Sequence, residues 1–362
     1  MIKYLGSKRA LTGWIKEVAA VLAAPHPIQR VVDLFAGSCR VAHALKAHGF
    51  SVLANDYNTY AFVLAQALVQ ADRRNYPPER VLPLLDWLMG LPPQTGWFTE
   101  TYCERARYFH PDNGARIEAM RNAIEAEVSE PLLKAILLTS LMLAADRVDS
   151  TTGIQMAYLK EWAPRALRPI HLRYPPLLEG EGIATQADAL ELAEQMRADL
   201  FYLDPPYNQH SYLANYHVWE TLVMWDQPDT YGVAQKRADV PKRKSVFNAR
   251  ATAHQALQAL IDRIDSRHLL LSFNDEGFFT REEIATMLEN RGGYWLCLKR
   301  PYRRYVGALI GIYNPKGEKV GRVSHTRNHE FLFIATHDKQ AYRTLRERFV
   351  KPYDSPHTIT SS

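Results

Sequence analysis

VVDLFAGSCRVAHALKAHGFSVLAND, residues 31–56, is the stretch that decides the fold. The apolar run at 31–34 predicts a buried strand, which leads into a turn of small residues at Gly37. Residues 39–48 have the apolar spacing of a helix, and Gly49 is placed to end it. Residues 51–54 predict a second strand that ends at Asp56. A strand, a glycine turn, a helix, a strand and an acid are the opening of a doubly wound α/β sheet that binds nucleotides.

Two residues of this opening indicate the ligand. Gly37 lets a ligand approach the backbone, and Asp56 is placed to accept hydrogen bonds from ribose hydroxyls. Ser38 and Cys39 follow Gly37, so the glycine pattern that cradles a pyrophosphate is incomplete. We therefore expect a nucleoside cofactor without a pyrophosphate. A nicotinamide enzyme, or a turn that only packs a helix on a sheet, remains an alternative.

The rest of the chain alternates between helical and strand patterns. Helical spacing recurs over 61–71, 80–89, 114–127 and 131–145, and strands are predicted at 183–186, 200–204, 268–273 and 330–335. Two further strands, 305–313 and 319–323, flank a turn. We expect a catalytic domain of residues 1–57 and 181–350, a helical target-recognition insertion at 58–180, and a flexible tail at 351–362.

Composition narrows the class of protein. The 362 residues are 47% hydrophobic, enough for a sizeable core, and the net charge of +5 is compatible with a polyanionic partner. Three scattered cysteines form neither a disulfide framework nor a metal-binding pair, and the histidines lack ligand spacing, so we expect no metal. Without an apolar segment typical of a signal peptide or a membrane span, a cytoplasmic protein is expected.

The segment LDPPYNQ, residues 203–209, carries the chemistry. Pro205 must end the strand before it, so Asp204 lies at the carboxyl end of a strand, where α/β sheets bind ligands. An exocyclic amine of a nucleobase is a poor nucleophile, because its lone pair is conjugated into the ring. The Asp204 carboxylate and the Pro205 carbonyl can accept its two N–H groups, while Tyr207 offers a stacking face. A methyl sulfonium in line with the nitrogen completes the transfer without a covalent enzyme intermediate.

Together these segments resemble the α-group N6-adenine-specific DNA methyltransferases, the Dam-like family that uses S-adenosylmethionine. The matching segments, in the order of that group, are Tyr4–Lys8, Asp33–Gly37, Asn55–Asp56, Asp188 and Asp204–Tyr207. The resemblance runs from residue 2 to about residue 336. It implies a Rossmann-like class I methyltransferase fold and methylation of a flipped adenine in double-stranded DNA, in a restriction-modification or orphan role. An RNA adenine methyltransferase and a non-catalytic DNA-binding relative remain alternatives.

The resemblance also implies roles for individual residues. The catalytic loop corresponds to Asp204, Pro205, Pro206 and Tyr207, and the cofactor site to Tyr4, Lys8, Asp33, Phe35, Ala36, Gly37, Asp56, Asp188 and Ala189. Tyr4 and Lys8 would close over the methionine end, Asp56 would bind the ribose, and Asp188 would lie near the adenine. Two residues depart from the family pattern: Cys39 replaces a glycine, and Ala189 replaces a phenylalanine of the adenine pocket.

Basic residues near the catalytic loop are candidates for DNA contacts. Lys242, Arg243 and Lys244 follow the loop and could hold phosphates, although a solvated loop needs no such role. Further candidates are Arg303, Arg304 and Lys316 near the C-terminus. As base readers in the insertion, the candidates are Arg105, Arg107, Tyr108, Asn113, Arg116 and Arg147, although a residue of this kind is individually more often a surface or structural residue. A companion restriction endonuclease is a possible partner, and a monomer is expected.

Overall fold

The computed structural model describes residues 1–156, 158–275, 277–303, 312–313, 319–321, 327–349 and 358–360. Its main sheet has eight strands, in the order β12-β8-β11-β7-β4-β1-β2-β3. Their bounds are β1 (Arg30–Asp33), β2 (Ser51–Asn55), β3 (Gly182–Thr185), β4 (Leu200–Leu203), β7 (His268–Asn274), β8 (Tyr294–Arg303), β11 (Arg327–Thr336) and β12 (Thr358–Thr360). Strands β2 and β3 are parallel, as are β4 and β7, whereas β11 runs antiparallel to β7 and β8. The predicted doubly wound, Rossmann-like α/β sheet is confirmed.

The chain folds as two compact units. Unit 1 consists of Met1–Lys16, Val32–Ala189 and His210–Ser245, and unit 2 of Glu17–Val31, Leu190–Gln209 and Val246–Ser362. Strand β1 and helices α1 (Thr12–Ala23) and α8 (Ala189–Gln195) contain points at which the chain passes between the units. Unit 1 holds all of residues 58–180 together with β2 and β3. The assignment of 58–180 to target recognition stays a prediction.

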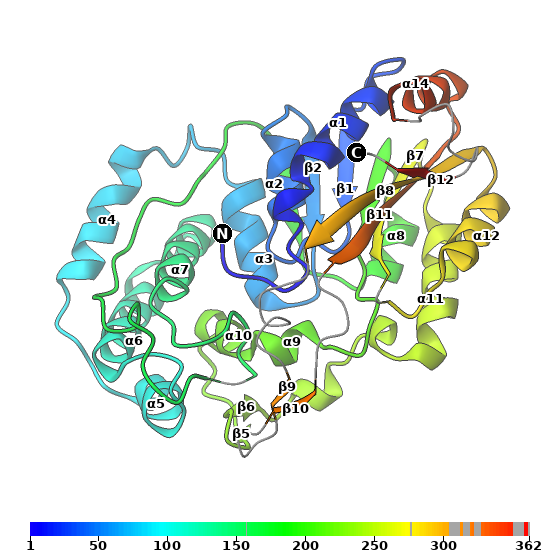
Figure 1. Ribbon diagram of the computed structural model, residues 1–362. Coiled ribbons are helices and arrows are strands. Elements are labelled where there is room, and N and C mark those ends of the chain that lie inside the picture. The colour runs from blue at the N-terminus through cyan, green and yellow to red at the C-terminus, as the bar shows by residue number, and fades with distance from the viewer. Residues whose placement is uncertain are drawn as a thin grey trace. The chain divides into compact units, whose positions relative to one another are not determined.

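Helices dominate unit 1. They are α2 (Arg40–Lys46), α3 (Thr59–Ala65), α4 (Pro78–Gly90), α5 (Trp97–Thr99), α6 (Pro111–Glu127), α7 (Pro131–Ala145), α9 (Tyr212–Asn215) and α10 (His217–Met224). A π-helical turn, Gln66–Gln70, continues α3. The bounds of α3 to α7 confirm the predicted helical run between the second and third strands. Figure 1 shows α4, α5, α6 and α7 gathered into one helical group, with α3 beside α7.

Helix α7 is buried along most of its length. Its residues from Ala135 to Ala145 are all buried, and nearly all of them are apolar. A helix that is hydrophobic on every side is stable only when it is surrounded by protein. The sequence from 131 to 145 therefore specifies a core helix, which packs against α3, α6 and α10.

Unit 2 carries the strands that position the catalytic loop. All four residues of β4 are buried, and β4 pairs with β7 from Leu200 opposite His268 to Leu203 opposite Leu271. The helices of this unit are α11 (Arg250–Arg263), α12 (Arg281–Arg291) and α14 (Lys339–Phe349). Helix α12 begins with a capping box, in which Thr280 and Glu283 satisfy each other's backbone N–H groups.

The C-terminal part of the chain is described only in segments. Strands β9 (Ile312–Tyr313) and β10 (Lys319–Gly321) are antiparallel, which agrees with two strands flanking a turn. The turn at 314–318 lies outside the described residues. Within the predicted tail, Thr358–Thr360 form β12, parallel to β8, and the other residues from 351 lie outside the described residues. No helix in the described part of the chain is long and apolar enough to cross a membrane.

Candidate active site

Gly37 forms the tight turn between β1 and α2 in unit 1. Its φ is +50°, and a Cβ atom built on it would lie only 3.0 to 3.2 Å from the ring and hydroxyl of Tyr4. Its backbone N–H donates to Oδ2 of Asp56 at 2.9 Å, which ties the turn to the end of β2. Only glycine combines this conformation with so close an approach by Tyr4. The structure thus brings together the predicted cofactor residues Tyr4, Gly37 and Asp56.

Cys39, which stands where the family pattern has glycine, keeps the backbone path of a glycine. It precedes α2 with φ 59° and ψ 18°, in the left-handed region, and its side chain is buried. A non-glycine residue in this region bears strain of about 1–2 kcal/mol. Cysteine at this position therefore adds strain, while the backbone keeps the left-handed conformation that a glycine would adopt.

Tyr4 is held over the turn by a cluster of tyrosines. Its ring stacks on those of Tyr212 and Tyr216, with centroids 5.2 and 4.7 Å away, and its hydroxyl lies 3.1 Å from that of Tyr60. The next residue, Leu5, donates its N–H to the Tyr216 hydroxyl at 2.5 Å. Burial raises the pKa of Tyr4 well above its usual value, so the hydroxyl stays protonated. These contacts place the N-terminal segment beside the glycine turn.

Asn55 joins the ends of the strands that carry the cofactor residues. Its Nδ2 donates to the carbonyls of Leu34 and Ala187, both at 3.1 Å. Its Oδ1 accepts from the Thr185 hydroxyl at 2.9 Å and from the Ala187 N–H at 3.1 Å. The buried amide therefore makes four hydrogen bonds. Asn55 positions the residue before Asp188, a role that no sequence motif assigned to it.

Asp56 is the acid at the end of β2. Its Oδ1 accepts from the backbone N–H of Asn58 at 2.9 Å and from Nδ2 of Asn58 at 3.1 Å. Burial raises the pKa of Asp56, and the hydrogen bonds from Asn58 and Gly37 oppose that rise. Oδ2 accepts one hydrogen bond and has a second lone pair. That lone pair suits a hydroxyl donor such as a ribose, so these residues fit a nucleoside cofactor.

Glu220, on α10, caps the helix that follows Asp56. Its carboxylate accepts from the N–H groups of Thr59 at 3.1 Å and Tyr60 at 2.9 Å, the first two residues of α3. The N-cap residue Asn58 makes no capping bond with its side chain. Glu220, which is fully buried, replaces that cap and complements the positive end of the helix dipole. Sequence reasoning missed Glu220, although an acid inside the apolar run 217–225 is a signal of a buried charge.

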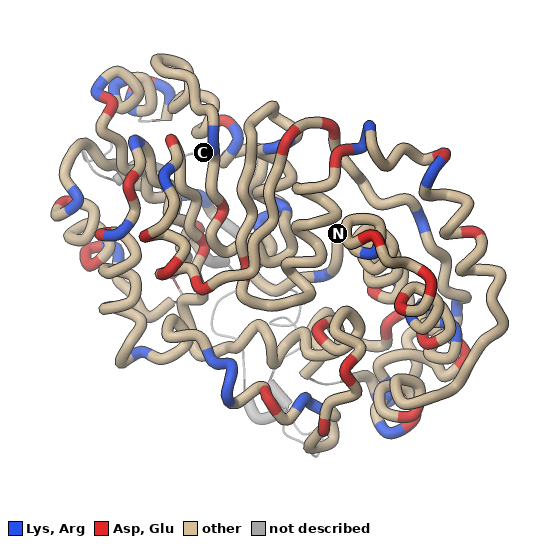
Figure 2. The backbone as a smooth tube through the Cα atoms, turned by 180° about the vertical axis from the view of Figure 1, so that it is seen from behind, with Lys and Arg blue, Asp and Glu red and all other residues tan. Residues whose placement is uncertain are grey.

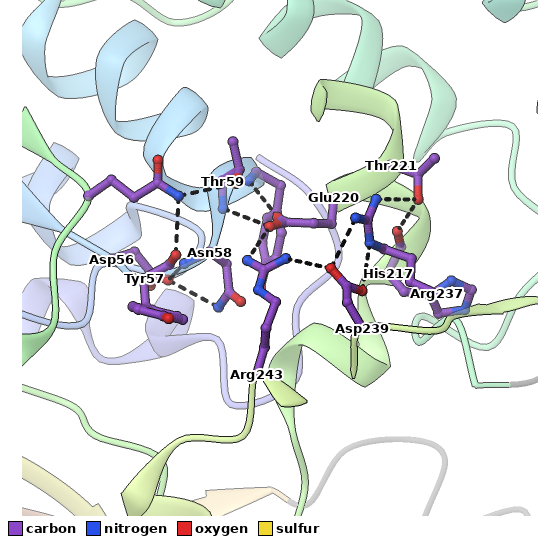
Figure 3. A network of polar contacts seen from close by, with 12 residues as sticks. Asp56, Tyr57, Asn58, Thr59, His217, Glu220, Thr221, Arg237, Asp239 and Arg243 are labelled. Atoms are coloured by element: carbon purple, nitrogen blue, oxygen red, sulfur yellow. Dashed lines mark hydrogen bonds and ion pairs between the residues drawn. The ribbon is translucent and has the colours of Figure 1, made fainter. Parts of the chain in front are cut away.

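A chain of ion pairs links Glu220 to residues 242–244, the basic segment (Figure 3). Arg243 lies 2.6 Å from Glu220 and 3.4 Å from Asp239, and Asp239 also pairs with the buried Arg237 at 3.1 Å. Arg237 pairs in turn with Asp226 at 2.7 Å. Arg243 therefore neutralises a buried carboxylate, which corrects its prediction as a phosphate contact.

The remaining predicted cofactor residues occupy different environments in unit 1. Lys8 and Asp33 are buried, Phe35 is half-buried, and Ala36 is buried next to Gly37. The Ala36 N–H donates to the Asn55 carbonyl at 2.8 Å. Asp188 is exposed just after β3, and the buried Ala189 begins α8.

The catalytic loop follows β4 in unit 2, at the carboxyl end of that strand. Tyr207 is 5% exposed; its ring contacts Phe273 with centroids 4.9 Å apart, and its hydroxyl accepts from Nδ2 of Asn274 at 2.7 Å. The Tyr207 carbonyl accepts from the Phe278 N–H at 2.8 Å. A Cβ on Gly277 would lie 2.4 Å from the Phe273 ring and 3.2 Å from this carbonyl. The end of β7 and the segment after it hold the loop, and Asn274 is a further residue to which sequence reasoning assigned no role.

The residues predicted to contact DNA differ in exposure and in their partners. Lys242 and Lys244 are exposed, whereas Arg105 pairs with Glu100, and Arg107 lies over the Trp162 ring at 4.3 Å. Asn113 is buried: it donates to the Ala166 and Arg168 carbonyls and accepts from the Ile170 N–H. Tyr108 is also buried, so the prediction of these two as base readers is wrong. The side chain of Arg303 and all of Arg304 and Lys316 lie outside the described residues.

Replacing Gly37 by alanine is expected to lower the affinity for S-adenosylmethionine about tenfold, since a left-handed alanine is strained by about 1–2 kcal/mol and its Cβ displaces Tyr4. Isothermal titration calorimetry measures this. Gly49→Ala is the matched control, because Gly49 has φ +98° with nothing within 4 Å of a built Cβ. It should lose stability but keep its affinity. Unchanged affinity in Gly37→Ala would contradict the role of the turn.

Comparison with known proteins shows the family of this chain. Residues 4–287 match the model of the D12 class N6 adenine-specific DNA methyltransferase family. The type II methyltransferase M.NlaIII of Neisseria lactamica is 30% identical over 92% of this chain and 98% of its own length. The type II methyltransferase M.CviAII of Paramecium bursaria Chlorella virus 1 is 29% identical over 86% of this chain and 95% of its own. The type II methyltransferase M.FokI of Planomicrobium okeanokoites is 30% identical over 84% of this chain, which spans about half of that longer protein (50%).

Proposed function

The chain belongs to the D12 class N6 adenine-specific DNA methyltransferases, and from this premise we propose roles for its residues and a biological setting for its reaction. The enzyme transfers a methyl group from S-adenosyl-L-methionine to the amino group of adenine in DNA. The observation that carries the proposal is the intact Asp204-Pro205-Pro206-Tyr207 sequence directly after the buried strand β4.

The catalytic loop activates the adenine amino group. The Asp204 carboxylate and the Pro205 carbonyl accept its two N–H groups, so the nitrogen lone pair becomes available for attack. Pro205 and Pro206 restrict the backbone, and Tyr207, held by Phe273 and Asn274, faces the base. S-adenosylmethionine, when bound, supplies the methyl group as a sulfonium. The adenine must leave the duplex for this reaction, because its amino group is otherwise paired.

The unit 1 residues would hold the cofactor. Asp56 would accept hydrogen bonds from the ribose hydroxyls, and Tyr4 and Lys8 would lie against the methionine end. Asp188 would lie near the cofactor adenine; the hydrogen bonds from Asn55 to the backbone of the preceding Ala187 support this role. Ala189 is too small to provide the aromatic face that the family pattern has there.

The biological setting is restriction-modification or an orphan modification role. Relatives named type II methyltransferases support this setting. We further propose that the enzyme acts as a monomer in the cytoplasm, on double-stranded DNA. In the restriction-modification setting, a restriction endonuclease of the same specificity is its companion.

Single-molecule sequencing of DNA from a methylation-free host that expresses the protein tests this function. N6-methyladenine in one short motif is the expected result, and it identifies the recognition sequence at the same time. DNA without modified adenine, from cells that contain the folded protein, would refute the proposal.

The lysines of the basic segment should control affinity without affecting sequence choice. Basic and acidic residues are interleaved along the helices of unit 1, which therefore offer no continuous basic surface for phosphates (Figure 2). Lys242 and Lys244 are both exposed, and we propose them as phosphate contacts. Replacing both by alanine should weaken binding to every duplex sequence and reduce the salt slope of the binding constant by about 2. Fluorescence anisotropy over a range of salt concentrations measures this. A loss confined to the target motif would instead make these lysines base readers.

A further inference from the structure

The N-terminal segment, residues 1–8, carries two of the proposed cofactor residues, Tyr4 and Lys8. Residues 1–7 form neither a helix nor a strand. A segment without its own ladder of backbone hydrogen bonds keeps one conformation only when other parts of the fold hold it. The contacts made by residues 1–3 therefore bear on the position of Tyr4 over the glycine turn.

Arg40, the first residue of α2, holds the start of this segment. Its Nη2 donates to the carbonyl of Ile2 at 3.2 Å and lies 3.4 Å from the carbonyl of Met1. The Ile2 side chain is fully buried. Helix α2 begins shortly after the glycine turn, so Arg40 ties the start of the segment to the same turn that Tyr4 covers.

Two buried acids that follow α7 hold Lys3. Oδ2 of Asp146 accepts the Lys3 backbone N–H at 3.1 Å, and Oδ1 of Asp149 accepts from Nζ of Lys3 at 2.6 Å. Asp149 also accepts from the Thr151 hydroxyl at 2.6 Å and from Nε of Arg165 at 2.9 Å. Lys3 is thus bound through both its backbone and its side chain, and other residues fix Asp149 in place.

Asp146 stands where a helix disfavours an acid. It is the C-cap residue of α7, at the negative end of the helix dipole, where a basic residue is favourable. Asp146 is also buried, and burial raises its pKa to about 6. Both the dipole and the burial disfavour the carboxylate, so this acid does not serve the helix that carries it. Residues that break local rules in this way are expected at functional sites.

We propose that Asp146 and Asp149 are positioning residues for S-adenosylmethionine: they hold Lys3, and with it the adjoining Tyr4, where the N-terminal segment closes over the cofactor. The inference rests on the proposed cofactor role of Tyr4 and Lys8. Without the acids the segment is held less firmly, and part of the binding free energy goes into ordering it. The two acids therefore set the affinity for the cofactor and not the rate of methyl transfer once the cofactor is bound.

Steady-state kinetics with varied S-adenosylmethionine, on a duplex that carries the motif found by sequencing, test this assignment. Asp146→Ala should raise KM for S-adenosylmethionine about tenfold and change kcat less than about twofold. Asp146→Asn keeps an oxygen that can accept the Lys3 N–H, so it should raise KM no more than about threefold. A role confined to the stability of α7 would instead lower the melting temperature and leave KM unchanged.

Lys3→Met tests the same contacts with a variant that leaves both acids in place. Methionine keeps the apolar stem of the half-buried lysine and removes its charge. The variant should raise KM for S-adenosylmethionine about threefold to fivefold. The double variant Lys3→Met/Asp149→Asn should raise KM by less than the product of the two single effects, because both changes weaken the same interaction.

Glu130→Ala is the matched control, because it removes an acid from the opposite end of the same helix. Glu130 is the N-cap residue of α7; it pairs with Arg80 at 2.5 Å and accepts from the Tyr76 hydroxyl at 2.6 Å. This variant should lose stability but keep the wild-type KM for S-adenosylmethionine.

A wild-type KM in both Asp146→Ala and Lys3→Met would overturn the inference, and so would a rise no larger than that in Glu130→Ala. Isothermal titration calorimetry of the wild type separates this result from a failure of the proposed function. If the wild type binds no S-adenosylmethionine, the proposed function itself fails. If it binds the cofactor and the variants bind equally well, only the positioning role fails.

Discussion

Replacing Asp204 by alanine abolishes methyl transfer, with an expected fall in kcat of about 10³-fold or more. The alanine removes the carboxylate that accepts a hydrogen bond from the adenine amino group, so the nitrogen lone pair stays conjugated into the ring. The lost interaction is made in the transition state, so KM for DNA should change little. Transfer of radiolabelled methyl groups to a duplex that carries the motif measures kcat.

The conservative variant separates this chemical role from a structural one. Asp204→Asn keeps one oxygen acceptor and should retain more activity than the alanine variant. Affinities of both variants for DNA and S-adenosylmethionine should stay within about threefold of wild type, a difference below 1 kcal/mol. Methylation by Asp204→Ala at near the wild-type rate would show that another group activates the amine.

Replacing Glu220 by alanine lowers the free energy of unfolding by about 3–5 kcal/mol, the cost of breaking a buried ion pair from one side. The alanine leaves the Arg243 guanidinium without its 2.6 Å partner and the N–H groups of Thr59 and Tyr60 without an acceptor. Urea denaturation measures the change. Glu220→Gln keeps an acceptor for the helix and should lose less.

An exposed ion pair of unit 1 provides the control. Glu100 and Arg105 have side chains that are 52% and 55% exposed, and Glu100→Ala should change stability by less than about 1 kcal/mol. Glu220 caps the N-terminus of α3, the helix that follows Asp56. Glu220→Gln should therefore also bind S-adenosylmethionine more weakly than wild type. If Glu220→Ala were as stable as Glu100→Ala, the Glu220–Arg243 pair would not stabilise the fold as a buried pair does.

Burial explains which predictions from the sequence were wrong. Arg243, Tyr108 and Asn113 were chosen because their side chains carry the donors that DNA contacts require. Arg243 pairs with Glu220, 23 residues away, and Asn113 accepts from Ile170, 57 residues away. No local pattern reports partners at such distances, so residue type alone could not separate a surface donor from an internal one.

The sequence by itself determined the opening strand, glycine turn, helix and strand of residues 31–56, the helical run between the second and third strands, the acid after the second strand and the catalytic loop. These features follow from local rules: apolar periodicity, the backbone limits of proline and glycine, and the chemistry of neighbouring residues. Only the tertiary structure decided that Asn55 joins the strand ends, that Glu220 caps α3, and that the buried Arg237 pairs with Asp226. A polar side chain takes its role from the partners that surround it when it is buried, and those partners come from distant parts of the chain.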